Sequence, residues 1–181
     1  MGLCRASVSD AETRRFTERS GGDASDTDGQ PARASKRERT SQTPYNSTQM
    51  SIIGIGVDLV ECARIQRSID RFGDRFLHRV FTDGEIEYSM SMKFPARHLA
   101  ARFAGKEAVS KAFGTGIGKA MGWRNIDIQK KESGEPFLVF SGPAQELATQ
   151  RGVGSALITL SHTEHHAIAS VVFEGATSQP K

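Results

Sequence analysis

The sequence has little cysteine and no long apolar run. Its 181 residues include two cysteines, Cys4 and Cys62, which lie far apart and lack the spacing of a metal site. Two such cysteines form no disulfide framework, so we expect a reducing, cytoplasmic setting. The longest apolar stretches have the length of a strand, far short of the roughly 20 residues that a membrane span needs. These absences argue against a disulfide-stapled secreted domain, and we expect no membrane partner.

Charge of one sign is not concentrated anywhere in the chain. There are 24 Lys and Arg against 21 Asp and Glu, and residues 1–49 hold eight of these bases and seven of these acids. A nucleic-acid partner needs a concentrated cationic face. We therefore expect that the protein binds no nucleic acid.

The first 49 residues contain almost no large aliphatic side chains. A segment so rich in Ser, Thr, Gly, Asp and Arg buries too little apolar surface to offset the entropy cost of ordering. It also has no apolar core of a signal peptide. We expect residues 1–49 to be a disordered tail or an extension upstream of a true start at Met50. Residues 50–175 then form the domain, and 176–181 a flexible C-terminus.

The pattern from residue 51 onward predicts the class α+β, with a mainly antiparallel sheet packed on one long helix. Ser51–Val60 is β-branched and apolar, which predicts a buried strand. Thr82 and Glu85 have the spacing of a capping box, and Pro95 opens the long helix. The other expected elements are helices over 61–72, 95–112 and 143–151, a hairpin of 126–131 and 137–141, and strands over 156–161 and 167–173.

The stretch IIGIGVDLVECARI, residues 52–65, begins like a phosphate-binding glycine turn and continues with acids. A dinucleotide fingerprint fails because its third glycine is Leu59, and the later FGTGIGKAMG lacks two residues of a Walker A loop. What remains is a strand ending in Asp58, whose glycines let a backbone or a ligand come close. An acid there repels phosphate unless a cation lies between them. Glu61 is expected to cap or pair with the following helix.

The long helix carries RFAGKEAVSKAFGTG, residues 102–116. Glu107 and Lys111 are four residues apart, so the simplest interpretation is an ordinary ion pair along the helix. The helix is also unusually small-sided, which predicts that another segment packs close to its backbone. The small residues are Ala100, Ala101, Ala104, Ala108 and Ala112.

Three histidines follow in LSHTEHHAIASVVF, residues 160–173. Without a nearby cysteine, His162, His165 and His166 make a poor zinc site. A single histidine that donates to a phosphate is the better hypothesis. His162 is favoured because it directly follows Ser161 at the strand end.

In their order and separation, GIGVDLVECARI, RFAGKEAVSKAFGTGIG, GEP and LSHTEHHAIASVV resemble the holo-[acyl-carrier-protein] synthases, the short bacterial family of 4′-phosphopantetheinyl transferases. The resemblance covers about residues 51–174. It implies transfer of 4′-phosphopantetheine from coenzyme A to a serine of apo acyl carrier protein, with release of adenosine 3′,5′-bisphosphate, in fatty acid biosynthesis. It also implies a homotrimer with active sites between subunits.

The resemblance further implies roles for single residues. Asp58 and Glu107 become Mg²⁺ ligands, which explains the acids after the glycine turn, because hard carboxylates suit Mg²⁺. Lys111 offsets phosphate charge in the transition state, and Glu107, or else Asp58, accepts the serine proton. The implied contacts to coenzyme A are Arg102, Lys111, Gly114, Thr115, Gly116, Ser161 and His162.

Arginines recur through the first expected helix and the segment after it. Each alone is an ordinary solvated residue, but as a set they make a basic dock for an acidic carrier. The resemblance implies carrier contacts at Arg64 and Arg75, and Arg79 is a further candidate.

Three alternatives for the function stay open: a broad-specificity transferase for peptide and polyketide synthase carriers, an inactive trimeric binding protein, and a magnesium nucleotide hydrolase.

Overall fold

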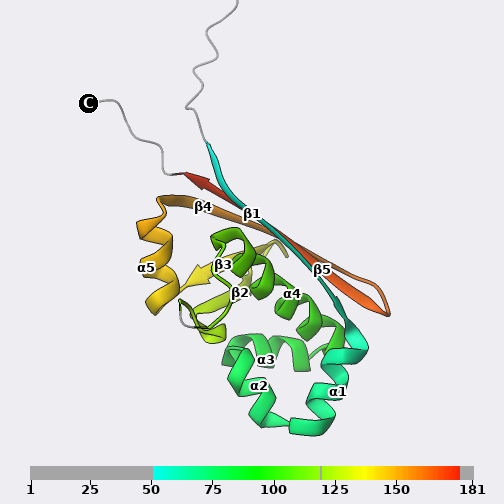
Figure 1. Cartoon of the computed structure of the whole chain (residues 1–181). Coiled ribbons are helices and arrows are strands. Elements are labelled where there is room, and N and C mark those ends of the chain that lie inside the picture. Colours follow the sequence, from blue (N-terminus) through cyan, green and yellow to red (C-terminus); the bar gives the residue numbers. More distant parts are fainter. Residues whose placement is uncertain (1–50, 119, 176–181) are drawn as a thin grey trace, which may run out of the picture. The chain divides into compact units, whose positions relative to one another are not determined.

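Figure 1 shows the computed structural model, which describes residues 51–118 and 120–175. The expectations for residues 1–49, Met50 and 176–181 lie outside the described residues and stay predictions. The elements are, in order, β1 (Ile52–Glu61), α1 (Cys62–Phe72), α2 (Asp74–Val80), α3 (Asp83–Met90), α4 (Pro95–Phe113), a short 3-10 helix η1 (Trp123–Asn125), β2 (Ile126–Lys130), β3 (Pro136–Phe140), α5 (Gly142–Gln150), β4 (Val153–His162) and β5 (His166–Gly175).

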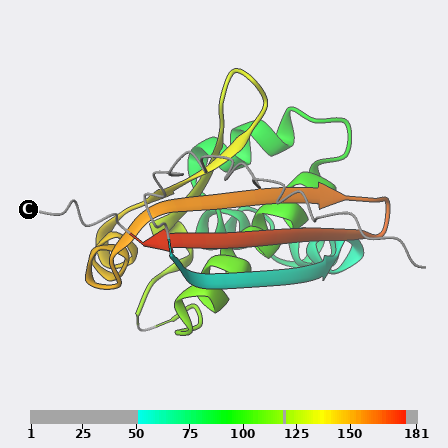
Figure 2. The same cartoon turned by 90° about the horizontal axis from the view of Figure 1, so that it is seen from above.

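Three long antiparallel strands form the main sheet in the order β1-β5-β4, and β2 and β3 form a separate hairpin. Figure 2 shows the three strands side by side, with α4 behind them. In the register, Asp58 pairs with Ala169 of β5, and His162 pairs with Ala167. Asp58 and His162 therefore lie near the same end of the sheet, on its two outer strands. The predicted α+β class, with an antiparallel sheet on one long helix, is confirmed.

Glycines in β1 let the strand lie directly on the backbone of α4. A Cβ added at Gly54 would lie 2.7 Å from the carbonyl oxygen of Ala112, and one at Gly56 would overlap the carbonyl oxygen of Ala108. Any side chain at Gly56 must therefore push the strand off the helix. The segment that packs close to the small-sided helix is thus β1 itself.

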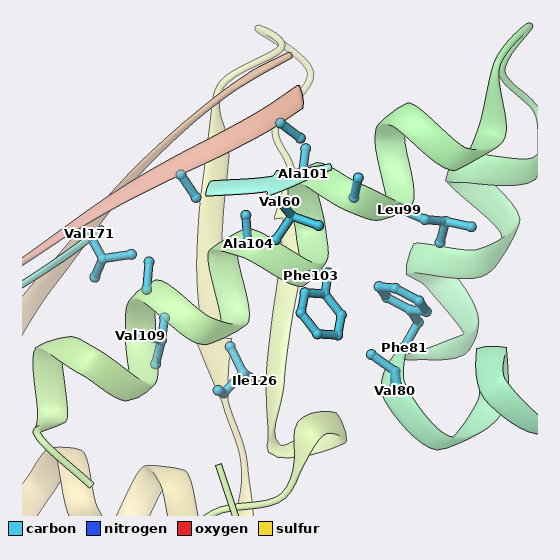
Figure 3. Close-up of a cluster of buried hydrophobic side chains, with 14 of the residues drawn as sticks. Val60, Val80, Phe81, Leu99, Ala101, Phe103, Ala104, Val109, Ile126 and Val171 are labelled. Carbon is cyan, nitrogen blue, oxygen red and sulfur yellow. The ribbon is translucent and has the colours of Figure 1, made fainter. Parts of the chain in front are cut away.

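The core lies between the sheet and the helices, with side chains from α2, α4, β2 and β5 in contact (Figure 3). Phe81, Leu99 and Val109 are fully buried there. The prediction that Ser51–Val60 is a buried strand is only half right, because alternate side chains of β1 point away from α4. These exposed residues, with their neighbours on β4 and β5, form what we call the open face: Ile53, Ile55, Val57, Leu59, Leu157 and Ile168.

Local signals explain most element boundaries. Thr82 and Glu85 form the predicted capping box at the start of α3, and Pro95 occupies the first turn of α4. Gly114 ends α4 with φ of 70°, a left-handed conformation that glycine adopts without strain. The sequence pattern missed α2. Within residues 51–118 and 120–175, no helix has the length and apolar character to cross a membrane.

Candidate active site

The close contact of β1 with α4 brings Asp58 and Lys111 together. Lys111 Nζ donates to Asp58 Oδ1 at 2.8 Å and to the carbonyl oxygen of Val57 at 2.9 Å. The Asp58 side chain is 16% exposed and that of Lys111 is 53% exposed. The structure therefore pairs Lys111 with the strand. The simpler interpretation of an ion pair between Glu107 and Lys111 is wrong for the described residues.

Glu107 lies on the same strand–helix contact, one turn before Lys111. Its neighbour Ala108 touches Gly56, which is two residues before Asp58 on the same face of β1. The half-buried Glu107 carboxylate has one weak partner, Ser110 Oγ at 3.5 Å from Oε2. We call Asp58, Glu107 and Lys111 the carboxylate site.

The carboxylate site fits Mg²⁺ by the chemistry of its oxygen donors. Mg²⁺ usually takes one or two protein carboxylates and completes its shell with water and substrate phosphates. Asp58 Oδ2 has no hydrogen-bond partner among the described residues, and Glu107 forms no ion pair there. No cluster of three or more His, Cys, Asp or Glu suited to a metal occurs in the part of the chain that the structure describes.

The loop after α4 offers fewer backbone donors than predicted. The Gly114 N–H donates to the carbonyl oxygen of Lys111 at 3.0 Å, and the Thr115 N–H donates to that of Ser110 at 3.2 Å. These two N–H groups therefore serve the end of the helix. The Thr115 hydroxyl and Gly116 remain as the groups of this loop that can face a ligand.

Two other predicted coenzyme A contacts, Arg102 and His162, lie in a different place. Both line a cavity of about 190 Å³ between α3, α4, the β2–β3 hairpin and the end of β4. Lys130 and His98 line it too, so we call it the cationic cavity. Lys111 and the loop after α4 do not line it. Within one chain, the predicted contacts thus form two separate groups.

Arg102 is a buried cation without a carboxylate partner in the described residues. It is 5% exposed, its guanidinium lies 4.2 Å from the centre of the Tyr88 ring, and its Nε has no hydrogen-bond partner. Burial lowers the pKa of Arg102, although Glu85 opposes the shift. The nearby carboxylates are already engaged: Glu85 pairs with Lys106 at 2.7 Å, and Asp127 accepts from Thr82 Oγ1 at 2.7 Å. An uncompensated buried cation of this kind favours an anionic ligand.

The side chains of Ser161 and His162 lie on opposite faces of the sheet, whereas the prediction placed both at one phosphate group. Successive side chains of a strand point to opposite faces of the sheet. His162 and Leu160 line the cationic cavity, whereas Ser161 is exposed and pairs in register with Ile168 of the open face. Because Ser161 and His162 are consecutive residues of a strand, their side chains lie on opposite faces of the sheet.

A buried ion pair was missed by the sequence reasoning. The side chains of Lys106 and Glu85 are both 0% exposed and meet at 2.7 Å. Lys106 also donates to the carbonyl oxygens of Trp123 and Ile126, and Glu85 accepts from the Ile128 N–H. Burial lowers the pKa of Lys106, with Glu85 opposing the shift. The pair ties α3, α4 and β2 together, and the capping-box pattern had revealed only one role of Glu85.

The predicted carrier arginines surround an apolar hollow. Arg64, Arg75 and Arg79 are exposed, and the Arg64 guanidinium lies 5.8 Å from the centre of the Phe103 ring. Glu61, expected to cap or pair with α1, makes no capping hydrogen bond but forms an ion pair with Arg67 of that helix at 4.0 Å. The hollow measures about 400 Å³, and we call it the arginine hollow; it is lined by Phe72, Arg75, Phe76, Arg79, Val80, Phe103 and Trp123.

Comparisons with known proteins identify the family of this chain. The model of the 4′-phosphopantetheinyl transferase superfamily matches residues 54–171. A holo-[acyl-carrier-protein] synthase of Koribacter versatilis is 45% identical over 123 residues, which cover 68% of this chain and 98% of that protein. The crystal structure of the synthase from Neisseria meningitidis is similar with a TM-score of 0.64 at 35% identity, over 68% of this chain and 98% of that one.

A further similar structure is the Helicobacter pylori holo-[acyl-carrier-protein] synthase in complex with coenzyme A. Its TM-score is 0.60 at 34% identity, and the match covers 66% of this chain and 98% of that one. The matches include both groups of candidate residues, because all of them lie within residues 54–171. The chain therefore belongs to the 4′-phosphopantetheinyl transferase superfamily, and within it to the holo-[acyl-carrier-protein] synthases, a family of enzymes.

Proposed function

We propose that this protein transfers 4′-phosphopantetheine from coenzyme A to a serine of apo acyl carrier protein. The observation that carries the proposal is the carboxylate site: Lys111 pairs with Asp58 at the contact of β1 with α4, and Glu107 lies one turn earlier on the same helix, in a chain of this family. The Helicobacter pylori relative was solved with coenzyme A, which supports coenzyme A as the donor. The acceptor follows from the family and from the arginine hollow.

The reaction forms one bond and breaks another at phosphorus. The serine oxygen of the carrier attacks the phosphorus that bears the pantetheine arm, and the bond to the leaving adenosine 3′,5′-bisphosphate breaks. Glu107 is the first candidate to accept the serine proton, because its carboxylate has only one weak contact. Asp58 is second, because Lys111 already holds its Oδ1.

Charge neutralisation is the other requirement of phosphoryl-type transfer. Asp58 and Glu107 would hold Mg²⁺, and a bound Mg²⁺ supplies positive charge to the diphosphate. Lys111 is half exposed, so its ammonium can reach a phosphate from its place beside Asp58. Arg102 and His162 bind another phosphate of coenzyme A in the cationic cavity. Thr115 and Gly116 lie beside the nucleotide.

The arginine hollow is the proposed dock for the carrier. Acidic carrier helices need cations around their rim and apolar surface at the centre, and the hollow has both, with Arg75 and Arg79 beside Phe76 and Trp123. Arg64 extends the basic rim over Phe103. The carrier serine must then reach the carboxylate site, which lies on the same helix α4 as Phe103.

We also propose a homotrimer in the cytoplasm, serving fatty acid biosynthesis. The open face exposes large apolar residues of β1, β4 and β5, and contiguous surface of this kind is usually covered by a partner. Assembly through it would bring the cationic cavity of one subunit toward the carboxylate site of the next. The separation of the two groups within one chain supports this arrangement.

Intact-mass spectrometry tests the proposed reaction. Apo acyl carrier protein is incubated with the full chain, coenzyme A and Mg²⁺, and a parallel sample contains EDTA. We expect the carrier to gain roughly 340 Da, one phosphopantetheine arm, with metal and nothing with chelator. An unmodified carrier beside intact coenzyme A, with the protein folded, would contradict the proposal. Release of inorganic phosphate without carrier modification would indicate a nucleotide hydrolase instead.

A further inference from the structure

A second histidine, His98, lies against His162 in the cationic cavity. The centres of the two rings are 4.9 Å apart and their planes meet at 75°, an edge-to-face contact. The centres of the His98 and Tyr88 rings are 6.0 Å apart. The backbone carbonyl oxygen of His98 accepts a hydrogen bond from Arg102 Nη1 at 3.4 Å. His98 therefore contacts two residues of the proposed phosphate site and supports the ring of one of them.

Among the described residues no carboxylate lines the cationic cavity, although Arg102 and Lys130 also line a second hollow that contains Glu85 and Asp127. The ionisable groups that surround His98 are Arg97 and Arg102 on α4, Lys130 on β2 and His162 on β4, together with Tyr88 of α3. Burial, followed by the charges of these cations, lowers the pKa of His98, so its ring is neutral near pH 7 in the free protein. Arg102, a buried cation that lines this cavity and has no carboxylate partner among the described residues, independently favours an anion here.

We propose that His98 is a positioning residue for a phosphate group of coenzyme A, and that the His98–His162 pair takes up a proton when this phosphate enters the cavity. The inference rests on the proposed function, since it takes coenzyme A as the ligand. His98 orients the His162 ring through the edge-to-face contact. A proton taken up by either ring adds a positive charge and a further N–H donor beside the phosphate dianion.

The direction of the pH dependence follows from the charges. A phosphate dianion within hydrogen-bond reach stabilises an imidazolium, so the pKa of the pair is higher in the complex than in the free protein. Because Arg102 and Lys130 already supply two positive charges, we expect uptake of at most one proton. Affinity for coenzyme A then rises as the pH falls through the pKa of the bound pair and down to that of the free pair, by up to about tenfold per pH unit for a full proton.

Isothermal titration calorimetry of the full chain with coenzyme A counts these protons when it is repeated in buffers of different ionisation enthalpy. The range pH 7.0–8.5 keeps the ligand a dianion, because the second pKa of a phosphate monoester is about 6. We expect the wild type to take up roughly 0.3 to 1 proton near pH 7. Dephospho-coenzyme A in a second arm distinguishes the phosphate monoester from the diphosphate as the group that is bound.

His98→Phe keeps a ring beside His162 and removes the titrating nitrogen. It should lower the uptake of protons to less than half and weaken coenzyme A binding about fivefold at pH 7, with less than a twofold change at pH 8.5. His98→Gln gives a second test if the Phe variant does not melt cooperatively. His78→Gln, on the exposed side of α2 beside Asp83, is the matched control and should bind like the wild type.

The outcomes separate this inference from the proposed function. Tight binding of coenzyme A without proton uptake, or full uptake by folded His98→Phe, would overturn the role of His98 and leave the transferase proposal intact. A wild-type protein that binds no coenzyme A at any pH in this range would overturn both.

Discussion

The two halves of α4 present opposite charge patterns to what we propose is one substrate, and we call the C-terminal half the acidic end and the N-terminal half the basic end. Toward its C-terminal end, Asp58 and Glu107 are acidic, and Lys111 is their only close cation within the described residues. Toward its N-terminal end, Arg102 and its neighbours in the cationic cavity are basic with no lining carboxylate. Carboxylates can hold a phosphate group only through a metal ion, whereas buried cations are suited to contact it directly. The acidic end is therefore suited to chemistry and the basic end to binding.

The largest effect should come from the acidic end. Glu107→Gln keeps the size of the side chain and removes its charge, so kcat/KM for carrier modification should fall by at least about 100-fold, as for lost transition-state charge stabilisation. The melting temperature should stay close to that of the wild type, because Glu107 is only half-buried. Asp70→Asn, on the exposed side of α1, is the matched control. Wild-type turnover by Glu107→Gln would remove the metal and base assignments.

A large effect on stability should come from the buried ion pair of Glu85 with Lys106, which lies on α4 between the acidic and basic ends. Lys106→Met leaves Glu85 as a buried charge with no cation, which should cost about 3–5 kcal/mol in the free energy of unfolding. Urea denaturation measures it. The double variant Lys106→Met with Glu85→Gln removes both charges and should recover part of the loss. If the single variant is as stable as the wild type, the pair does not hold α3 and α4 together.

A substitution at the basic end should weaken the binding of coenzyme A without lowering the free energy of unfolding. Arg102→Met removes a buried cation that has no carboxylate partner, so the free energy of unfolding should stay level or rise by about 1 kcal/mol. Affinity for coenzyme A should fall by about tenfold to 100-fold, the value of one or two hydrogen bonds to a charged group. Titration calorimetry and urea denaturation of the same sample test both. Loss of stability with unchanged affinity would show that Arg102 is structural.

The smallest effect should come from the arginine hollow. Arg75→Glu should raise KM for the carrier about threefold at low salt and leave kcat unchanged, since an exposed charge acts mainly on encounter. The difference should shrink at about 0.5 M salt, where such charges are screened. Arg151→Glu, at the end of α5 and outside the hollow, is the control. Equal effects of the two variants would argue against docking at the hollow.

Local patterns predicted the elements that hold the site. The strand that carries Asp58, the capping box at Thr82 and the limits of α4 at Pro95 and Gly114 all follow from neighbouring residues, although β1 continues past Asp58 to Glu61. The helix missed by these patterns, α2, is separated from α1 by Gly73 alone, and Gly73, as its N-cap residue, provides no side-chain cap. A helix without its own start signal merges with its neighbour in a sequence.

The partners of the site residues depended on contacts that are distant in the sequence. Lys111 pairs with Asp58, 53 residues away, and Lys106 with Glu85 on another helix. The burial of Arg102 and its contact with Tyr88 depend on how α3 packs on α4. Of these features, only the separation of Ser161 from His162 could have been predicted from the sequence, because successive side chains of a strand alternate between the two faces of a sheet.

One measurement tests most directly whether the acidic end performs the chemistry and the basic end binds coenzyme A. It is the single-turnover rate of carrier modification at saturating coenzyme A, compared for Asp58→Asn and Arg102→Gln. If the acidic end performs the chemistry and the basic end binds the donor, excess coenzyme A restores most of the rate to Arg102→Gln and none to Asp58→Asn. If folded Asp58→Asn transfers the arm as fast as the wild type, the carboxylate site is not where the reaction occurs.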